Sequence, residues 1–505
     1  MDTINEQTNE NGINEGRNKT SSLEEFYAGS GILVTGATGF VGKGLLEKLI
    51  RMCPRIAAIF ILLRPKANET MEQRFKKLID DPIYDDIKAK NPSVFHKVYP
   101  VKSDMSLSDL GLSREDRNLL LEKVNIVFHV AATVRFNESL HVAVNVNTKG
   151  TLRVIELWNE LKHPISFVHV STAFSNANLP EIGEKVYTTS LKPSEVINMC
   201  DNFDKRSINE IEKKILKTYP NTYTFSKNLA EQIVATKCKD MPVAIVRPSV
   251  IGASIEEPCP GWIENISAVT GTFLLIGKGY ATAVRGRRDT NLDVVPVDFV
   301  VDTIICIAWH VTLHRDHEVK VYNCTSNAYP FKFGPMIDAM VKCSIDTPLN
   351  DTLWYPGCSV VANKYIYNIL SVIPRVFLAF VIDIFLRLRG SKPIMMKLLR
   401  NSNKLFASFA FFTTREWTFQ RDNCSDLARK VKMLHDSDMV KLDLRDMNWK
   451  RYGDTYQMGI KKFILKEEFK STARQRLSRL YWIHQITKIS GIITLLWIIL
   501  RLVYR

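Results

Sequence analysis

The stretch TGATGFVGKGLLEKLI, residues 35–50, decides the fold of this chain. It follows an apolar run at residues 32–34 and continues into leucines at helical spacing. A strand, a glycine-rich turn and a helix in this order form a dinucleotide site, because the helix N-terminus offers free N–H groups and a positive dipole end to a pyrophosphate. The motif therefore predicts a βαβ unit that binds a dinucleotide.

Each glycine of this turn has its own role in the interpretation. Gly36 permits the tight turn, Gly39 lets a pyrophosphate approach the backbone, and Gly42 lets the helix pack close to the sheet. The other residues expected at the cofactor are Thr35, Thr38 and Phe40. The spacing is GxxGxxG rather than GxGxxG, so the glycines alone would also fit an ordinary strand–turn–helix. The position after the first strand favours the cofactor site.

Further apolar runs alternate with helical patterns up to about residue 170. The runs typical of strands are residues 32–34, 57–63, 98–101, 126–130 and 166–170. Strands separated by helices imply βαβ units, so we expect an α/β fold with a doubly wound parallel Rossmann sheet. The alternation becomes irregular and stops near residue 350, where a helical C-terminal region is expected.

The second predicted strand ends in ILLRPK and offers no acidic residue. NAD sites usually place Asp or Glu there to bind the ribose hydroxyls. Arg64 and Lys66 suit the 2′-phosphate of NADP instead, although two solvated surface charges would give the same pattern. Asp104, after the third strand, is placed to meet the adenine. Ala131 and Ala132, after the fourth, would let the backbone pass close to the ribose.

A candidate catalytic pair lies in NTYTFSKNLAEQIV, residues 221–234. Tyr223 and Lys227 are four residues apart and so share one face of a helix. A nearby ammonium, and the oxidised nicotinamide ring, would lower the pKa of the phenol. Tyr223 could then donate a proton to a carbonyl oxygen while Lys227 also holds the nicotinamide ribose. An isolated YxxxK often marks only a surface helix, but its place after four βα units favours catalysis.

A hydroxyl partner is expected at the end of the fifth strand. The run FVHVSTAFSN supplies Thr172, our first choice as hydrogen-bond donor to the substrate oxygen, and Ser171, our second. Asn147, on the intervening helix, could anchor a water relay to Lys227, or be a plain helix asparagine.

These motifs, together with AIVRPSVIGAS at 244–254 and EPCPGWIEN at 257–265, resemble the fatty acyl-CoA reductases that make fatty alcohols. This family belongs to the extended short-chain dehydrogenase/reductase superfamily. The resemblance covers roughly residues 22–465, and IPRVFLAFVIDIFLRLRGSKP at 373–393 is similar to the family's second, male-sterility domain.

The resemblance implies a reaction. Long-chain fatty acyl-CoA would be reduced with NADPH to a primary fatty alcohol in two hydride transfers, the first releasing CoA through a hemithioacetal. A covalent relay through Cys238 or Cys259 is disfavoured because neither has an adjacent histidine. The alternatives are a two-electron reductase that stops at the aldehyde or acts on another carbonyl substrate, and a non-catalytic membrane lipid-binding protein. The intact Thr172, Tyr223 and Lys227 argue against the last.

The chain also departs from the family pattern. Phe174 stands where Tyr is common, and Ser103 precedes Asp104 where Gly is usual. Neither change removes a catalytic group, so both leave substrate preference open. The loop at 260–262, Pro-Gly-Trp, is either a packed corner or, as we prefer from the resemblance, a loop that faces cofactor or substrate.

The composition narrows the partners. The formal net charge of +15 over 505 residues favours a nucleotide cofactor or an anionic membrane. The sequence lacks the basic runs interleaved with aromatic residues that a nucleic-acid groove requires, so nucleic acid is not expected as a partner. Nine scattered cysteines without a CxxC fit reduced cytosolic thiols, with neither a disulfide framework nor a metal site expected. A homodimer is left open.

The end of the chain differs from the rest. Residues 489–504 read ISGIITLLWIILRLVY and would span about 24 Å as a helix, against a hydrocarbon core of about 30 Å. Snorkelling basic residues would make up the difference. We expect a membrane anchor with the catalytic domain in the cytosol, at the endoplasmic reticulum first and peroxisomes second. Residues 365–388 and 394–412 are too interrupted to span; they would close a soluble core, or shelter the acyl chain and dip into the membrane surface.

Four regions follow. Residues 1–24 are expected to be a disordered polar tail, and 25–345 an NADP-binding Rossmann and substrate domain. Residues 346–465 would form the helical C-terminal domain. Residues 466–505 would form a basic linker and the hydrophobic anchor.

Overall fold

The computed structural model describes residues 22–504, apart from residues 67, 267, 314–316, 446 and 469–470. Most of the expected polar tail, residues 1–21, lies outside the described residues. Its last residues take part in the first helix, α1 (Leu23–Tyr27), which Ser22 caps by accepting a hydrogen bond from the Glu25 amide at 3.1 Å.

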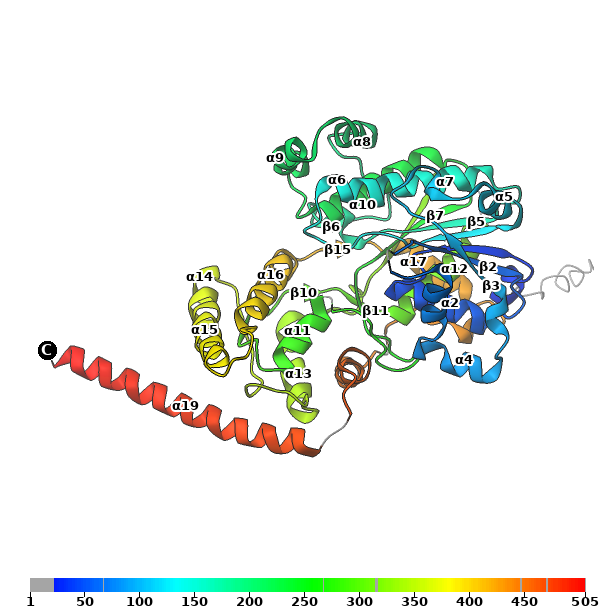
Figure 1. Ribbon diagram of the computed structural model, residues 1–505. Helices are drawn as coiled ribbons and strands as arrows, with labels where there is room; N and C mark the ends of the chain where they lie inside the picture. Colours follow the sequence, from blue (N-terminus) through cyan, green and yellow to red (C-terminus); the bar gives the residue numbers. More distant parts are fainter. Residues whose placement is uncertain are drawn as a thin grey trace, which may run out of the picture.

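A seven-stranded sheet forms the centre of the molecule, in the order β12-β7-β5-β4-β1-β2-β3 (Figure 1). All neighbouring strands pair in parallel. The strands are β1 (Gly31–Thr35), β2 (Ala58–Leu63), β3 (Val98–Lys102), β4 (Ile126–His129), β5 (Ser166–Val170), β7 (Val243–Pro248) and β12 (Lys320–Cys324). The strand order reverses between β1 and β4, and ligands of such sheets bind in the crevice at the carboxyl ends there. The doubly wound Rossmann sheet predicted from the sequence is confirmed.

Helices cover both faces of the sheet (Figure 1). One face carries α5 (Arg114–Lys123), α7 (Lys149–Glu160) and α10 (Thr222–Lys237), and the other carries α2 (Phe40–Met52) and α12 (Val297–His310). Two separate apolar clusters fill these layers. Because most of these strands are buried on both faces, they appear in the sequence as continuous apolar runs rather than as alternating patterns.

The remaining elements surround this core. Those between the sheet strands are α3 (Met71–Ile79), α4 (Asp85–Lys90), α6 (Leu140–Ala143), β6 (Glu181–Ile182), α8 (Pro193–Asn202), α9 (Lys205–Leu216), β8 (Val250–Gly252), α11 (Ala268–Gly277), β9 (Ala283–Arg285), β10 (Asn291–Leu292) and β11 (Val294–Pro296). Those after β12 are β13 (Phe331–Lys332), α13 (Phe333–Asp346), β14 (Ser359–Val361), α14 (Lys364–Tyr367), α15 (Ile373–Leu388), α16 (Met395–Thr413), β15 (Thr418–Phe419), α17 (Asp422–Val431), α18 (Trp449–Gly459) and α19 (Ser471–Val503).

The C-terminal third is mainly helical, as expected, but it also returns to the Rossmann layers. β14 pairs with β9 and β15 pairs with β6, so two short strands occur where the sequence indicated only helix. Asn423, on α17, donates a hydrogen bond to the Val321 carbonyl of β12 at 2.8 Å. The two strand pairs thus join residues beyond 350 to the segments that contain β6 and β9, and Asn423 joins them to the edge of the central sheet.

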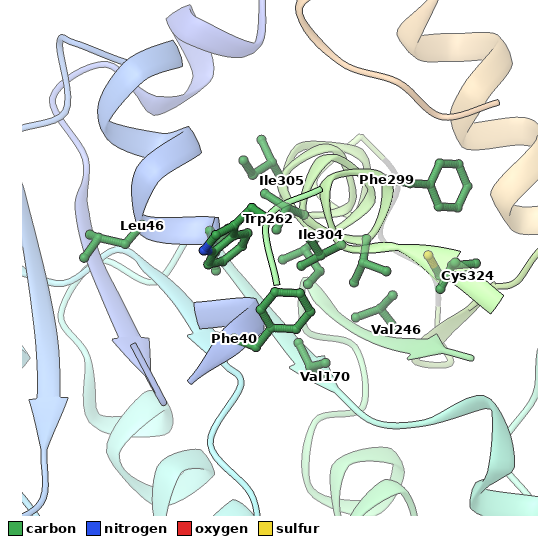
Figure 2. Close-up of a cluster of buried hydrophobic side chains, with 14 of the residues drawn as sticks. Phe40, Leu46, Val170, Val246, Trp262, Phe299, Ile304, Ile305 and Cys324 are labelled. Atoms are coloured by element: carbon green, nitrogen blue, oxygen red, sulfur yellow. The ribbon is translucent and has the colours of Figure 1, made fainter. Parts of the chain in front are cut away.

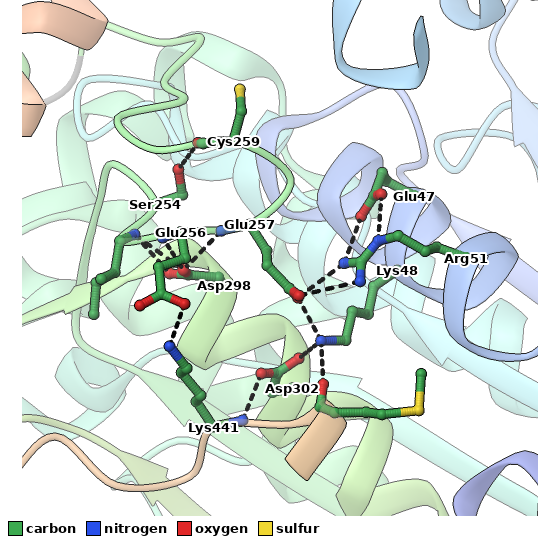
Figure 3. A network of polar contacts seen from close by, with 12 residues as sticks. Glu47, Lys48, Arg51, Ser254, Glu256, Glu257, Cys259, Asp298, Asp302 and Lys441 are labelled. Atoms are coloured by element: carbon green, nitrogen blue, oxygen red, sulfur yellow. Dashed lines mark hydrogen bonds and ion pairs between the residues drawn. The ribbon is translucent and has the colours of Figure 1, made fainter. Parts of the chain in front are cut away.

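A polar network makes a second connection between the same parts (Figure 3). The Lys48 ammonium, on α2, contacts Glu257 at 2.5 Å, Asp302 at 3.0 Å and the Met439 carbonyl at 2.6 Å. Asp302, on α12, also accepts the Lys441 amide at 2.7 Å. Burial raises the pKa of Asp302 to about 7, and the Lys48 ammonium opposes that rise by favouring the carboxylate.

Trp262 lies in the hydrophobic core and not at a ligand surface (Figure 2). Only 1% of it is exposed, and its ring lies 4.8 Å from that of Phe40. Gly261 has a φ of +76°, and a Cβ there would come within 2.4 Å of the Thr455 carbonyl oxygen. The expectation of a ligand-facing loop at 260–262 is therefore wrong for its Gly-Trp corner, which is fixed by close packing against α2 and α18.

The last helix, α19, is longer than the anchor expected at residues 489–504. It has 33 residues and so spans about 50 Å, because the residues expected to form a basic linker continue the same helix. Within the described part of the chain it is the one helix long and apolar enough to cross a membrane. Its first half is docked: Trp354 donates to His484 at 3.0 Å, and the Tyr355 ring lies 5.2 Å from that of Tyr481.

Candidate functional site

The glycine-rich turn has the geometry of a phosphate-binding turn. Gly36 has a φ of +75°, and a Cβ there would lie 2.8 Å from the Ala131 amide nitrogen. A Cβ on Gly42 would lie 2.2 Å from the Gly36 carbonyl oxygen, so α2 can pack this close only with glycine. Gly39 caps α2 without any side-chain hydrogen bond, and it is exposed together with Thr38. The N-terminus of α2 is thus open to an anion.

Thr35 and Phe40 support this turn from inside. The Thr35 hydroxyl accepts hydrogen bonds from the amides of Val130 and Ala131, at 3.1 and 3.0 Å, and lies 2.8 Å from Nδ1 of His129. Phe40 is 9% exposed and packs on Trp262. Of the six turn residues expected at the cofactor, the exposed ones are Thr38 and Gly39.

The two cations after β2 differ in their surroundings. Both are exposed, but the Lys66 ammonium lies 3.6 Å from Glu69, which also attracts Lys77 at 3.3 Å. Arg64 forms no ion pair with any described residue. The Glu69 carboxylate could not be placed beside Lys66 from the motif alone, and it partly neutralises that lysine. Arg64 is therefore the stronger candidate for a phosphate contact.

The loops after β3 and β4 complete the dinucleotide crevice. Asp104 is half-buried and accepts hydrogen bonds from the amide and hydroxyl of Ser106, at 2.9 and 2.7 Å, which fixes its carboxylate. The Ser103 hydroxyl donates to the Leu110 carbonyl at 2.9 Å, which holds this loop closed. Ala131 and Ala132 are half-buried beside the turn.

Tyr223 and Lys227 lie on α10, as the four-residue spacing predicts. The Lys227 ammonium is 2% exposed and donates to the Val170 carbonyl at the end of β5, at 2.8 Å. Burial lowers the pKa of Lys227 to about 8, and the carboxylate of Glu231 opposes that shift. An ammonium carries three donors, so two stay available for a ligand.

The Tyr223 phenol is half-buried. Burial raises its pKa to about 12, and a hydrogen-bonding interaction with the Thr172 hydroxyl offsets part of that rise. The Lys227 ammonium is held at the Val170 carbonyl, and its expected lowering of the Tyr223 pKa stays a prediction. The phenol is fully protonated at neutral pH, which is the state that a proton donor needs.

Thr172 and Ser171 point to different partners, although they are adjacent. The Ser171 hydroxyl donates to Glu231 at 2.5 Å, and Glu231 forms a fully buried pair with Arg247 at 2.6 Å. Thr172 accepts the Phe174 amide at 3.3 Å and lies within reach of Tyr223. The structure therefore brings Thr172 to the tyrosine and leaves Ser171 in a structural network.

Asn147 lies in a π-helical turn, Val144–Thr148, that begins where α6 ends. Its amide group accepts from the Thr133 amide at 2.8 Å and donates to the Thr133 carbonyl at 3.1 Å and to Ser226 at 3.0 Å. It thus ties the loop after β4 directly to α10. This is a positioning role that differs from the expected water relay to Lys227.

Two buried histidines beneath the site were not found from the sequence. His129 joins Thr35 to Thr151, whose hydroxyl donates to the Asn147 carbonyl at 2.6 Å. Burial lowers the pKa of His129 to about 3 and that of His169 far below its usual value. Both rings are therefore neutral, and the nearby Lys227 ammonium contributes to the lowering of both pKa values.

An aromatic cluster adjoins the Tyr223 phenol. Phe136 stacks on Tyr223 with ring centroids 5.8 Å apart, and it meets Phe412 at 5.7 Å and Phe409 at 5.8 Å. Phe412 in turn contacts Phe174 at 5.0 Å. Since Phe409 and Phe412 come from α16, the C-terminal third supplies an apolar wall beside the catalytic candidates. This aromatic wall could not be found from the sequence, because apolar residues are common in any helix.

The candidate cysteines are poorly suited to a covalent relay. Cys238 is fully buried, and burial raises the pKa of its thiol to about 12. Burial also raises the pKa of Cys259.

Comparison with known proteins identifies the family. Two family models described as male sterility protein, the first of them an NAD-binding one, match residues 34–304 and 375–467. Fatty acyl-CoA reductase 1 of Mus musculus is 36% identical over 91% of this chain and 90% of its own length. Fatty acyl-CoA reductase 2 of Homo sapiens is 34% identical over 92% and 91%.

Solved structures show the same fold at low identity. The terminal R domain from the myxalamid PKS-NRPS biosynthetic pathway has a TM-score of 0.57 and 19% identity, covering 86% of this chain and 91% of its own. The reductase domain of a nonribosomal peptide synthetase from Mycobacterium tuberculosis has a TM-score of 0.57 and 16% identity, covering 85% and 91%. With the dinucleotide turn, the catalytic candidates and these relatives in view, the chain belongs to the fatty acyl-CoA reductase family and is an oxidoreductase that uses a nicotinamide cofactor.

Proposed function

We propose that this protein reduces long-chain fatty acyl-CoA to a primary fatty alcohol with NADPH, in two successive hydride transfers that release CoA. The observation that carries the proposal is the position of Thr172 and Tyr223: Thr172 follows β5, at the carboxyl edge of the sheet where the dinucleotide turn follows β1, and Tyr223 lies beside the aromatic wall. The names of the relatives support the acyl-CoA substrate.

Each reduction uses the same residues. Thr172 and Tyr223 hold the carbonyl oxygen, and the reduced nicotinamide supplies a hydride to the carbonyl carbon when it is bound. Tyr223 gives its phenolic proton to the oxygen, and Lys227 stabilises the resulting phenolate and holds the nicotinamide ribose. The first round converts the thioester to a hemithioacetal, which breaks its C–S bond to give an aldehyde and the CoA thiol. The second converts the aldehyde to the alcohol.

The preference for NADPH rests on Arg64. Its guanidinium is exposed after β2 and is free of carboxylate partners among the described residues, whereas Lys66 faces Glu69. A guanidinium binds a phosphate through two parallel hydrogen bonds, which an ammonium cannot form. The dinucleotide would lie along the open N-terminus of α2, with Asp104 near the adenine and Ala131 and Ala132 near the ribose.

The extent of reduction separates this proposal from a reductase that stops at the aldehyde. Two NADPH oxidised for each CoA released would indicate alcohol formation, and a ratio of one would indicate aldehyde release. Neither a ketone nor a sugar nucleotide would be expected to use the apolar wall formed by Phe136 and Phe412.

The membrane association is assigned to α19. Its apolar second half is exposed, and the helix as a whole is long and apolar enough to cross a bilayer. The endoplasmic reticulum is our first choice of membrane and the peroxisome our second, with the catalytic domain in the cytosol, where acyl-CoA and NADPH are supplied.

We expect Tyr223→Phe to abolish fatty alcohol formation while NADPH still binds. A positioned proton donor is typically worth about 10²–10⁴-fold in rate, and phenylalanine keeps the stacking on Phe136. Turnover with a long-chain acyl-CoA and NADPH affinity by fluorescence check the two halves. Near-normal turnover of the purified variant would remove Tyr223 from the mechanism.

Thr172→Val and Ser171→Ala form a matched pair. Loss of the Thr172 hydroxyl should lower kcat by about 10²-fold or more, because a donor to the developing oxyanion is lost. Loss of the Ser171 hydroxyl should leave kcat within a few-fold and lower the free energy of unfolding by about 1.5–3 kcal/mol, because the lost bond is to the buried carboxylate of Glu231. Steady-state kinetics and thermal unfolding of both variants make the comparison; equal losses of kcat would contradict the assignment.

Arg64→Ala should reduce the preference for NADPH over NADH more than Lys66→Ala does. The reason is that Lys66 is already partly neutralised by Glu69, whereas Arg64 is free for a charge-assisted phosphate contact. The measurement is kcat/KM for both cofactors in the wild-type protein and the two variants. If the wild-type protein uses NADH and NADPH equally well, the cofactor proposal fails.

Deletion of residues 485–505 should release the protein from membranes in a high-salt wash, while the full-length chain stays in the pellet. Salt screens electrostatic attraction to lipid headgroups but does not extract a spanning helix. Fractionation of cells that express each form provides the test. The anchor is elsewhere if the truncated protein resists the wash as the full-length chain does.

A further inference from the structure

A second apolar surface, separate from α19, lies on α14, α15 and the π-helical turn between them. Its exposed side chains recur every three or four residues and so form one stripe along the helix. We call α14, α15 and α16 together the hairpin, since α15 and α16 are consecutive helices that pack against each other. We call the exposed stripe the hairpin face; it consists of Ile366, Ile369, Ile373, Val376, Phe380, Ile384 and Leu388. Their exposed fractions run from 38% at Val376 to 77% at Leu388, which is unusual for so many neighbouring apolar residues.

The polar residues that interrupt this stretch in the sequence point away from the hairpin face. Asp383 is 7% exposed and accepts the amides of Met395 and Met396, both at 2.9 Å, so it caps the first turn of α16. The Arg375 guanidinium donates to the Ser371 carbonyl at 2.8 Å and to the Tyr367 hydroxyl at 3.2 Å. The polar groups thus hold the hairpin together, and the outer face stays apolar.

The charge around the hairpin has one sign. Residues 357–413 contain eight Lys and Arg and one acidic residue, the buried Asp383. Three of the basic residues, Arg387, Arg389 and Lys392, are exposed at the tip where α15 turns into α16. An apolar stripe next to a basic tip is the pattern of a helix that lies in the interface of an anionic membrane.

The hairpin also lies on the side of the molecule from which α19 leaves. Figure 1 shows α14, α15 and α16 at the end away from the seven-stranded sheet, and α19 extends toward the same end. A chain whose α19 enters a bilayer would therefore bring the hairpin close to that bilayer.

We infer that the α14–α16 hairpin is a second membrane contact, in which the hairpin face inserts into the interfacial layer of an anionic leaflet and the basic tip lies among the headgroups. Such helices insert by roughly 5–10 Å. The biological role of this contact, delivery of an acyl chain, rests on the proposed function. The inner side of α16 carries Phe409 and Phe412, which contact Phe136 beside Tyr223. The hairpin would then contact lipid through α14 and α15 and the reaction site through α16, which offers an acyl chain an apolar route from the leaflet.

The test uses the full-length protein in vesicles that contain anionic lipid. A fluorophore is attached at Phe380→Cys, in the hairpin face, or at Phe203→Cys, a control position of similar exposure (56% and 50%) between α8 and α9. The unmodified chain is treated with the same fluorophore, and the signal from its native cysteines is subtracted. Nitroxide groups on the lipid chains should quench the label at 380 several-fold more than the label at 203. Replacing Arg387, Arg389 and Lys392 together by Glu should reduce the quenching at 380 although α19 still holds the protein in the membrane.

Equal quenching at the two positions would overturn the inference. So would a label at 380 that is shielded both from lipid nitroxides and from aqueous iodide, because a second copy of the chain would then cover the face. NADPH-dependent reduction of acyl-CoA is measured on the same samples. Activity without quenching at 380 removes only the membrane contact, whereas quenching without activity removes the proposed function and leaves the contact in place.

Discussion

The site depends on how closely the end of β1 approaches the end of β4. The Thr35 hydroxyl binds the amides of Val130 and Ala131, and Gly36 lies so near Ala131 that no Cβ would fit between them. This contact sets the position of the cofactor turn relative to the loop after β4. Asn147 fixes the same loop through Thr133 and reaches Ser226 on α10. The turn and the catalytic helix are thus positioned by one continuous set of hydrogen bonds.

The carboxyl end of β5 is fixed by a buried pair of charges. Arg247 and Glu231 are fully buried, and Glu231 also binds Ser171. Removing one partner of such a pair typically costs about 3–5 kcal/mol, because the other charge is left without compensation. Lys227 binds the carbonyl of Val170 in the same region. Thr172 therefore has rigid neighbours on its β5 side, although its own hydroxyl faces the half-buried Tyr223.

The C-terminal third is joined to this core in two different ways. Near α2 the connection is polar and is centred on Lys48, with Asp302 and a backbone carbonyl of the C-terminal segment as partners. Beside Tyr223 the connection is aromatic and is made by Phe136 and Phe412. Hydrogen-bonded charges specify one arrangement, whereas stacked rings leave an apolar surface that a flexible chain can share. The polar connection at Lys48 therefore holds the C-terminal third firmly, while the aromatic connection beside Tyr223 can admit substrate.

Much of the fold could be predicted from the sequence, because buried parallel strands are continuous apolar runs and the glycine turn has fixed steric needs. Tyr223 and Lys227 could be paired because helical spacing is regular. Contacts between distant segments could not be predicted. The carboxylate of Glu69 beside Lys66, the core position of Trp262 and the inward direction of Asp383 all depend on tertiary packing. The start of α19 could not be predicted either, because a basic, polar stretch is compatible with a helix as well as with a linker.

The length and docking of α19 have a mechanical consequence. A flexible tether would let the enzyme body drift away from the bilayer and rotate freely above it. Here an unbroken helix contacts Trp354 and Tyr355 of the body through its first half and is apolar in its second, so it is a stiff connection. In the proposed membrane-bound state, this stiff helix would restrict both the height of the body above the lipid and its tilt, so that every catalytic cycle would take place in nearly the same orientation relative to the leaflet.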